Sequence, residues 1–181
     1  GPTGKLLKPL GDLGFEEAYD LFVQVVRAGE EAGADLVLAE TMSDSYEVKA
    51  AMLAAKENCG LPVFATTVYD LSGKMLTGAD PVSMVALLEG LGADAIGINC
   101  GLGPEQMKSI VPVLYEYASV PIIVNPNAGL PRVSEEGTVF DIAPQEFADT
   151  MADIVKLGAR IVGGCCGTTP EHIRALHDAI R

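Results

Sequence analysis

Three of the four cysteines of this chain occupy positions where thiol chemistry could take place. Cys165 and Cys166 are adjacent within a glycine-rich segment, and Cys100 follows an apolar run far upstream. Disulfide geometry makes a bridge between adjacent cysteines difficult. Thiolates are preferred zinc ligands, and three of them with an open fourth position are typical of a catalytic zinc site. The cysteines therefore favour a metal-binding or catalytic use in a reducing compartment over a disulfide framework.

The glycines of the segment Gly163–Gly167 would allow a sharp turn of the backbone around the adjacent cysteines. Side chains alternate along a regular strand, so two neighbouring thiols can face one metal only where the backbone bends sharply. Other interpretations stay open. The cysteines could be small core residues or hold a structural zinc in a non-catalytic module. The Gly163–Thr169 loop precedes a helix and could instead bind a phosphate ester, although that leaves the set of three cysteines unexplained.

The elements that must position these residues follow a repeating order. From residue 35 onward, short apolar runs alternate with longer segments of helical period, which is typical of a parallel sheet with crossover helices. The predicted strands are Asp35–Thr41, Pro62–Tyr69, Ala93–Cys100, Pro121–Asn125 and Arg160–Gly164. The predicted helices are Phe15–Ala32, Asp44–Asn58, Pro81–Leu91, Pro104–Tyr117, Pro144–Leu157 and Pro170–Ile180. The segment Leu130–Ile142 is predicted to form a small hairpin after the fourth strand.

The spacing of the strand ends, about thirty residues, is typical of a (β/α)8 TIM barrel. Such a barrel needs about 250 residues, whereas this chain has 181. We therefore predict an α/β fold in which residues 1–181 form a single domain, a partial barrel with about five parallel strands and the first strands missing. An open, doubly wound sheet is the alternative. Open sheet edges invite pairing with another chain, so we also expect that a homo-oligomer could form.

Polar and thiol side chains are predicted at the C-terminal end of every strand. In parallel β/α folds these ends converge on the face that carries the active site. The residues there are Glu40–Thr41, Thr66–Thr67, Asn99–Cys100, Asn125–Asn127 and Cys165–Cys166. Glu40 could be a structural carboxylate or contact a substrate, and Asn127 could be a turn residue. Cys59 is predicted at the opposite end of the sheet, and His172 and His177 are expected to be solvated helix residues.

The composition disfavours several classes of partner. The formal net charge is −13, whereas nucleic acids and anionic lipid surfaces bind clustered lysines and arginines. No apolar run approaches the ~20 residues that span a bilayer, and the N-terminus has no pattern of a secretory signal. We therefore expect a cytoplasmic enzyme that binds neither nucleic acid nor membranes.

Several short motifs resemble one known family. The chain resembles the homocysteine S-methyltransferases, and within them the N-terminal homocysteine-binding modules of cobalamin-dependent methionine synthases. The motifs that carry this resemblance are Gly1–Leu6, Glu40–Thr41, Leu76–Gly78, Gly97–Cys100, Pro126–Gly129 and Gly163–His172. The last of them is highly specific, and the resemblance extends over nearly the whole chain.

The resemblance implies a barrel with Zn²⁺ at its C-terminal mouth, held by Cys100, Cys165 and Cys166. It also implies that Glu40 binds the amino group of homocysteine. Asn127 matches an asparagine near the metal that can stand in as a ligand when substrate is absent. The homocysteine sulfur would take the fourth zinc position as a thiolate and attack an activated methyl group, which gives methionine.

The family pattern leaves the methyl donor open. Methylcobalamin bound to another module is expected from the likeness to methionine synthases, whereas related enzymes use S-methylmethionine or betaine. The implied partners are homocysteine and the cobalamin and folate modules of the same parent protein. The chain departs from the family by lacking its first strands, which also line the substrate pocket.

Overall fold

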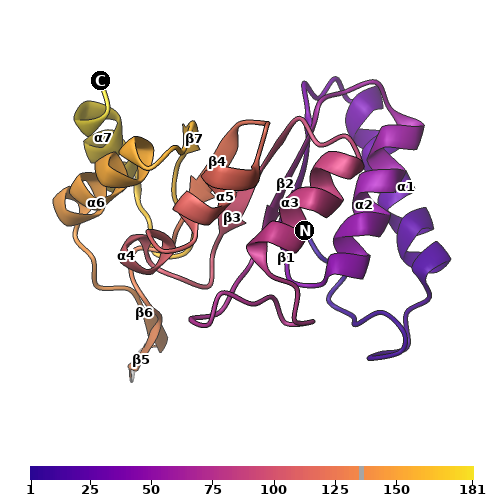
Figure 1. The fold of residues 1–181 in the computed structure, drawn as a ribbon, viewed down its shortest axis with the longest axis horizontal. Helices are drawn as coiled ribbons and strands as arrows, with labels where there is room; N and C mark the ends of the chain where they lie inside the picture. Colours follow the sequence, from indigo (N-terminus) through magenta and orange to yellow (C-terminus); the bar gives the residue numbers. More distant parts are fainter. Residues whose placement is uncertain (135–136) are drawn as a thin grey trace.

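The computed structural model describes residues 1–134 and 137–181, and a five-stranded parallel sheet forms its centre (Figure 1). The strands are β1 Val37–Met42, β2 Val63–Thr67, β3 Ala95–Asn99, β4 Ile122–Asn125 and β7 Ile161–Val162. Their order across the sheet follows their order in the chain. A doubly wound sheet would instead reverse its strand order at a switch point. The structure thus confirms the α/β class and the five parallel strands, and the doubly wound alternative is wrong.

Helices alternate with the strands along the chain (Figure 1). They are α1 Phe15–Glu31, α2 Ser45–Asn58, α3 Pro81–Gly90, α4 Pro104–Met107, α5 Val111–Tyr117, α6 Pro144–Lys156 and α7 Pro170–Ala179. Side-chain caps define two of the starts. Asp44 accepts a hydrogen bond from the backbone N–H of Tyr46 at 2.8 Å, and Asp80 accepts one from Ser83 at 2.9 Å. In the described part of the chain, no helix is long and apolar enough to cross a membrane.

One of the predicted helices, Pro104–Tyr117, is wrong as a continuous element. Helix α4 ends at Met107, and α5 begins only at Val111. Pro112 occupies the first turn of α5. Proline has no backbone N–H, and its ring would clash with the carbonyl four residues earlier, so a helix cannot easily run through this position.

The last strand is shorter than the predicted Arg160–Gly164, because only Ile161 and Val162 pair with β4. The chain then turns tightly. A Cβ atom at Gly164 would lie 2.4 Å from the Thr168 side chain, so only glycine fits there. This turn starts the loop that carries the adjacent cysteines.

The predicted hairpin within Leu130–Ile142 is confirmed. It consists of β5 Arg132–Ser134 and the antiparallel β6 Gly137–Val139, and Figure 1 shows it projecting away from the helices. Residues 135 and 136 of this predicted hairpin lie outside the described residues. At the base of the hairpin, Arg132 forms an ion pair with Asp141 at 2.9 Å.

The core lies between the sheet and the helices. Strand β3 is buried along its whole length, as expected for a strand covered on both faces. Its Ile96 and Ile98 pack in one cluster with Leu88 of α3 and Phe147 of α6. Burying a side chain of this size contributes about 1.5–3 kcal/mol. Strand β1 is an outer strand with exposed apolar residues at its edge, including Leu36 and Leu38.

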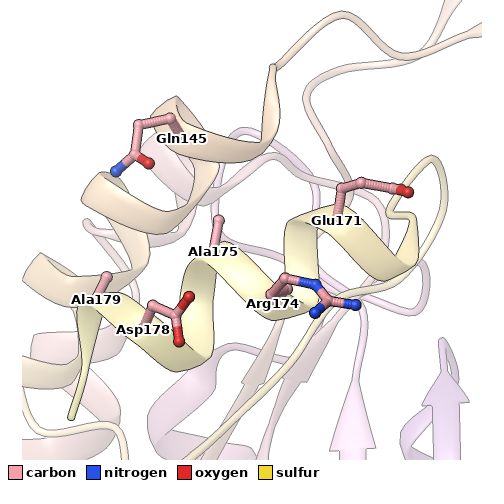
Figure 2. Close-up of a pocket in the computed structure, with 6 residues that line it drawn as sticks. All are labelled: Gln145, Glu171, Arg174, Ala175, Asp178 and Ala179. Carbon is pink, nitrogen blue, oxygen red and sulfur yellow. The ribbon is translucent and has the colours of Figure 1, made fainter.

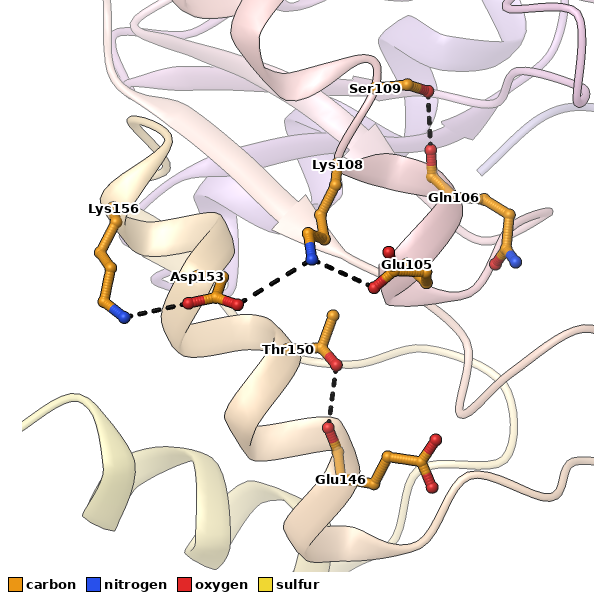
Figure 3. Close-up of polar contacts among 8 residues, drawn as sticks. All are labelled: Glu105, Gln106, Lys108, Ser109, Glu146, Thr150, Asp153 and Lys156. Atoms are coloured by element: carbon orange, nitrogen blue, oxygen red, sulfur yellow. Dashed lines mark hydrogen bonds and ion pairs between the residues drawn. The ribbon is translucent and has the colours of Figure 1, made fainter.

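Exposed charges connect α4 to α6 (Figure 3). The Lys108 ammonium lies 3.2 Å from the Glu105 carboxylate and 3.9 Å from that of Asp153, and Lys156 approaches Asp153 at 2.9 Å. Exposed pairs of this kind contribute about 0–1 kcal/mol each. Burial of Phe147 and its neighbours, rather than these ion pairs, therefore holds α6 against the sheet.

Candidate metal centre

The three predicted cysteines converge at the C-terminal edge of the sheet. Cys100 follows β3, whereas Cys165 and Cys166 follow β7, with β4 between them. The Sγ atom of Cys166 lies 3.7 Å from that of Cys100 and 4.0 Å from that of Cys165, and all three lie within 4.8 Å of one another. Tetrahedral zinc with sulfur ligands at about 2.3 Å would separate the sulfurs by about 3.8 Å. The thiol positions therefore fit a tetrahedral metal ion.

The backbone around Cys100 is shaped to turn its thiol toward this cluster. Cys100 has a φ of +56°, in the left-handed region that residues other than glycine seldom adopt. Its N–H donates to the carbonyl of Asn125 on β4 at 3.1 Å, and its carbonyl accepts from Leu102 at 2.7 Å. Because these bonds hold both sides of the peptide, the strained conformation persists.

The loop of the adjacent cysteines is pinned to the end of β4. The N–H of Cys165 donates to the carbonyl of Pro126 at 2.8 Å, and the carbonyl of Cys166 accepts from Ala128 at 2.9 Å. The N–H of Cys166 donates to Oδ1 of Asn127 at 3.1 Å, and Asn127 is buried. Asn127 therefore lies beside the cluster, and its carbonyl oxygen holds the cysteine loop.

The other predicted site residue, Glu40, lies on the same edge of the sheet but on a different strand. It is half-buried near the end of β1. Among the described residues, the group of side chains close enough to share a metal ion consists of the three cysteines and does not include Glu40. The structure thus brings together Cys100, Cys165, Cys166 and Asn127, and Glu40 is not part of this group.

Burial raises the pKa of the Cys165 thiol to about 12, and the neighbouring Cys100 adds to this rise. The pKa of Cys166 is raised as well, by burial and by its contact with Cys100. Three thiolates at these distances repel one another, so they need a cation in order to ionise together. A divalent metal ion held by these cysteines would supply that charge in place of the thiol protons.

Exposure and hydrogen bonding weaken two of the alternatives. Cys100 and Cys165 are half-buried and Cys166 is exposed, which does not fit small core residues. The N–H groups of Cys165, Cys166, Thr168 and Thr169 all donate within the protein. Because a phosphate would need such amides free, these four are not available to bind one, which weakens the alternative of a phosphate site in this loop.

The expectation that His172 is a solvated helix residue is wrong. His172 is buried, and its Nδ1 accepts from the N–H of Thr169 at 3.1 Å. Its Nε2 lies 2.9 Å from the carbonyl of Ile142, and its ring packs edge-on against Phe147. The sequence did contain a signal, because Thr169 and His172 have the spacing of a capping box. His177 is exposed, as expected.

A separate groove of about 400 Å³ lies between α6 and α7, and Figure 2 shows the side chains that line it. They are Gln145, Glu171, Arg174, Ala175, Asp178 and Ala179. The cysteines do not line this groove. Charges of both signs alternate along α7 there, so no single ligand chemistry follows from it.

Taken together, the sequential parallel sheet and the thiol cluster at its C-terminal edge define a β/α protein with a candidate catalytic metal centre. Residues 1–180 match the family model described as homocysteine S-methyltransferase, and the chain belongs to this family of methyltransferases. The family predicted from the motifs is therefore confirmed.

Curated and solved relatives agree with this assignment. Methionine synthase from Mycobacterium leprae is 37% identical over 186 residues, which cover 99% of this chain and 15% of that protein. The crystal structure of the homocysteine methyltransferase MmuM from Escherichia coli in its apo form has a TM-score of 0.75 at 27% identity, over 93% of this chain and 58% of that one. The metallated form of MmuM has a TM-score of 0.74 at 29% identity, over 92% and 52%. The chain thus spans little more than half of MmuM and a small part of the synthase.

Proposed function

We propose that this chain binds homocysteine and takes part in methyl transfer to its thiol, which gives methionine, with Zn²⁺ held by Cys100, Cys165 and Cys166. The observation that supports this most directly is the convergence of the three sulfurs to spacings of 3.7 and 4.0 Å. Membership of the homocysteine S-methyltransferases supplies the substrate class. The similar MmuM has also been solved in a metallated form, which supports the proposal that this chain binds a metal.

The donor set suits the chemistry. A free thiol has a pKa of about 8.5, so most of it is protonated at neutral pH. When bound, Zn²⁺ would hold the homocysteine sulfur in its deprotonated, nucleophilic form. Three thiolate ligands leave room for one further ligand, which distinguishes a substrate-binding site from a closed structural one.

The remaining site residues would orient the substrate. Glu40 is half-buried near the end of β1, and we propose that its carboxylate pairs with the amino group of homocysteine. Asn127 would keep the cysteine loop in place through its bond to the N–H of Cys166. Its buried carboxamide beside the cluster also supports the proposal that Asn127 can lie next to the metal when no substrate is bound.

The methyl donor would come from outside this chain. The chain covers 15% of the Mycobacterium leprae methionine synthase, so a parent protein would have room for cobalamin and folate modules. Methylcobalamin on such a module is the proposed donor, and S-methylmethionine and betaine are the competing ones. The exposed apolar edge of β1 supports pairing with a further segment or a second copy. A reduced compartment such as the cytoplasm would keep the thiols free.

The first test is the zinc content of the purified chain. We expect about one zinc per chain and its loss in Cys100→Ser, because zinc needs all three thiolates for a tight site. Cys59→Ser is the matched control, since Cys59 lies at the end of α2 and outside the cluster. Wild-type chain without zinc, or a Cys100→Ser variant that keeps its zinc, would contradict the proposal.

A second test separates the substrate-binding site from a structural zinc module. Homocysteine should change the spectrum of the cobalt-substituted chain, because its sulfur enters the metal's coordination sphere. Chelation should leave the helical circular dichroism signal largely intact, since none of the three thiols belongs to the packed hydrophobic core. Unfolding on chelation together with an unchanged cobalt spectrum would instead support the structural module.

A further inference from the structure

One buried carboxamide connects the two sides of the mouth. Asn99, the last residue of β3, is fully buried. Its Oδ1 accepts from the N–H of Thr41 at 3.0 Å and from the hydroxyl of Thr66 at 2.7 Å. Its Nδ2 donates to the hydroxyl of Thr41 at 2.7 Å and approaches Sγ of Cys165 at 3.8 Å. The ends of β1 and β2 and the cysteine loop thus meet at a single side chain.

The orientation of this carboxamide follows from its neighbours. A backbone N–H can only donate, so the atom that faces the N–H of Thr41 must be the oxygen. The NH₂ group is therefore the part of the carboxamide that faces the hydroxyl of Thr41 and the thiol of Cys165. A flipped amide would place two donors face to face at Thr41 and remove the donor from the sulfur.

Two strained residues lie beside Asn99. Thr41 has a φ of +63° and Cys100 a φ of +56°, and both are left-handed without being glycine. Such conformations cost about 1–3 kcal/mol each and persist only where neighbouring contacts hold them. Asn99 bonds to both the N–H and the hydroxyl of Thr41, and it directly precedes Cys100.

We propose that Asn99 is a positioning residue of the metal centre, whose NH₂ group holds and polarises the Cys165 thiolate while its oxygen fixes the strand end that carries Glu40. The donor would offset part of the repulsion among three close thiolates, because a hydrogen bond to the charged form of a group favours that form. Hydrogen-bonding partners behind metal ligands typically change metal affinity 10–100-fold. This inference rests on the metal site of the proposed function.

The test compares three variants of the full chain by their affinity for Zn²⁺, measured in competition with a chelator at about pH 8. Asn99→Asp keeps the acceptor for Thr41 and removes the donor to Cys165. Asn99→Ala removes the donor without adding charge. Thr66→Val is the matched control, because it removes a bond to the same carboxamide on the side away from the sulfur. Urea unfolding of each variant reports its global stability separately.

We expect both Asn99 variants to bind Zn²⁺ about 10–100-fold more weakly and Thr66→Val to stay within about threefold of wild type. The sulfur-to-metal absorption band of the cobalt-substituted Asn99 variants should shift, whereas that of Thr66→Val should not. Wild-type affinity in Asn99→Ala would overturn the inference, even if Asn99→Asp binds weakly, because charge alone would then explain the loss. Wild-type chain that takes up no metal would overturn the proposed function itself.

Discussion

His172 should be a major source of stability for the C-terminal part of the chain. It lies in the first turn of α7, directly after the cysteine loop, and is buried. Because Nδ1 accepts from the N–H of Thr169, the ring proton is on Nε2, which donates to the carbonyl of Ile142. One imidazole therefore holds both the start of α7 and the segment that leads into α6.

The effect of His172→Ala can be worked out from these contacts. Losing the bond to the helix start costs about 1 kcal/mol, and leaving the Ile142 carbonyl without its donor costs about 1–2 kcal/mol. The edge-on contact with Phe147 at 5.5 Å is lost as well, at about 0.5–1.5 kcal/mol. The better helix propensity of alanine returns about 0.5 kcal/mol. We expect a net loss of about 2–4 kcal/mol.

Urea unfolding followed by circular dichroism measures this loss. With a slope of about 2 kcal/mol per molar urea, the midpoint should fall by about 1–2 M. His177→Ala is the matched control, because His177 is exposed on the same helix and gains the same helix propensity. Its midpoint should stay within about 0.3 M of wild type. If His172→Ala and His177→Ala unfold at the same midpoint, the deduced role of the buried imidazole is refuted.

Two further substitutions test the sheet. Gly97→Ala should destabilise the chain by about 3 kcal/mol or more, because a Cβ there would lie 1.9 Å from the carbonyl oxygen of Ile123. Thermal unfolding measures this loss. Gly29→Ala is the control and should be neutral or stabilising, because a Cβ at Gly29 in α1 would meet open space. The hydrogen bond from the N–H of Val63, with Lys56 nearby, lowers the pKa of the Asp94 carboxyl in the folded chain. The ionised carboxylate therefore stabilises the fold fully above the ordinary pKa of about 3.9, and this contribution is lost as the pH falls through the lower pKa of the folded state. Asp94→Asn should therefore unfold at a lower midpoint than wild type at pH 7, and this difference should shrink as the pH falls below about 3.9. A difference that stays constant with pH would contradict this assignment.

The sequence alone was sufficient for the strands, most of the helices and the choice of the three cysteines that the structure brings together. Strands covered on both faces must be almost continuously apolar, and this local signal identified all five. The glycines beside Cys165 and Cys166 indicated a sharp turn, and three thiols indicated a metal. The error at Pro104–Tyr117 was avoidable, because the effect of Pro112 is local.

Only the tertiary structure decided how distant residues meet. The contact of Cys100 with Cys166, the burial of His172 and the place of Asn99 between β1 and the cysteine loop depend on strand order and register. Periodicity records which face of an element is apolar, but it does not record which other elements that face meets. The sequence pattern therefore does not distinguish an isolated polar residue on the surface, such as His177, from one in a buried hydrogen-bond network, such as His172.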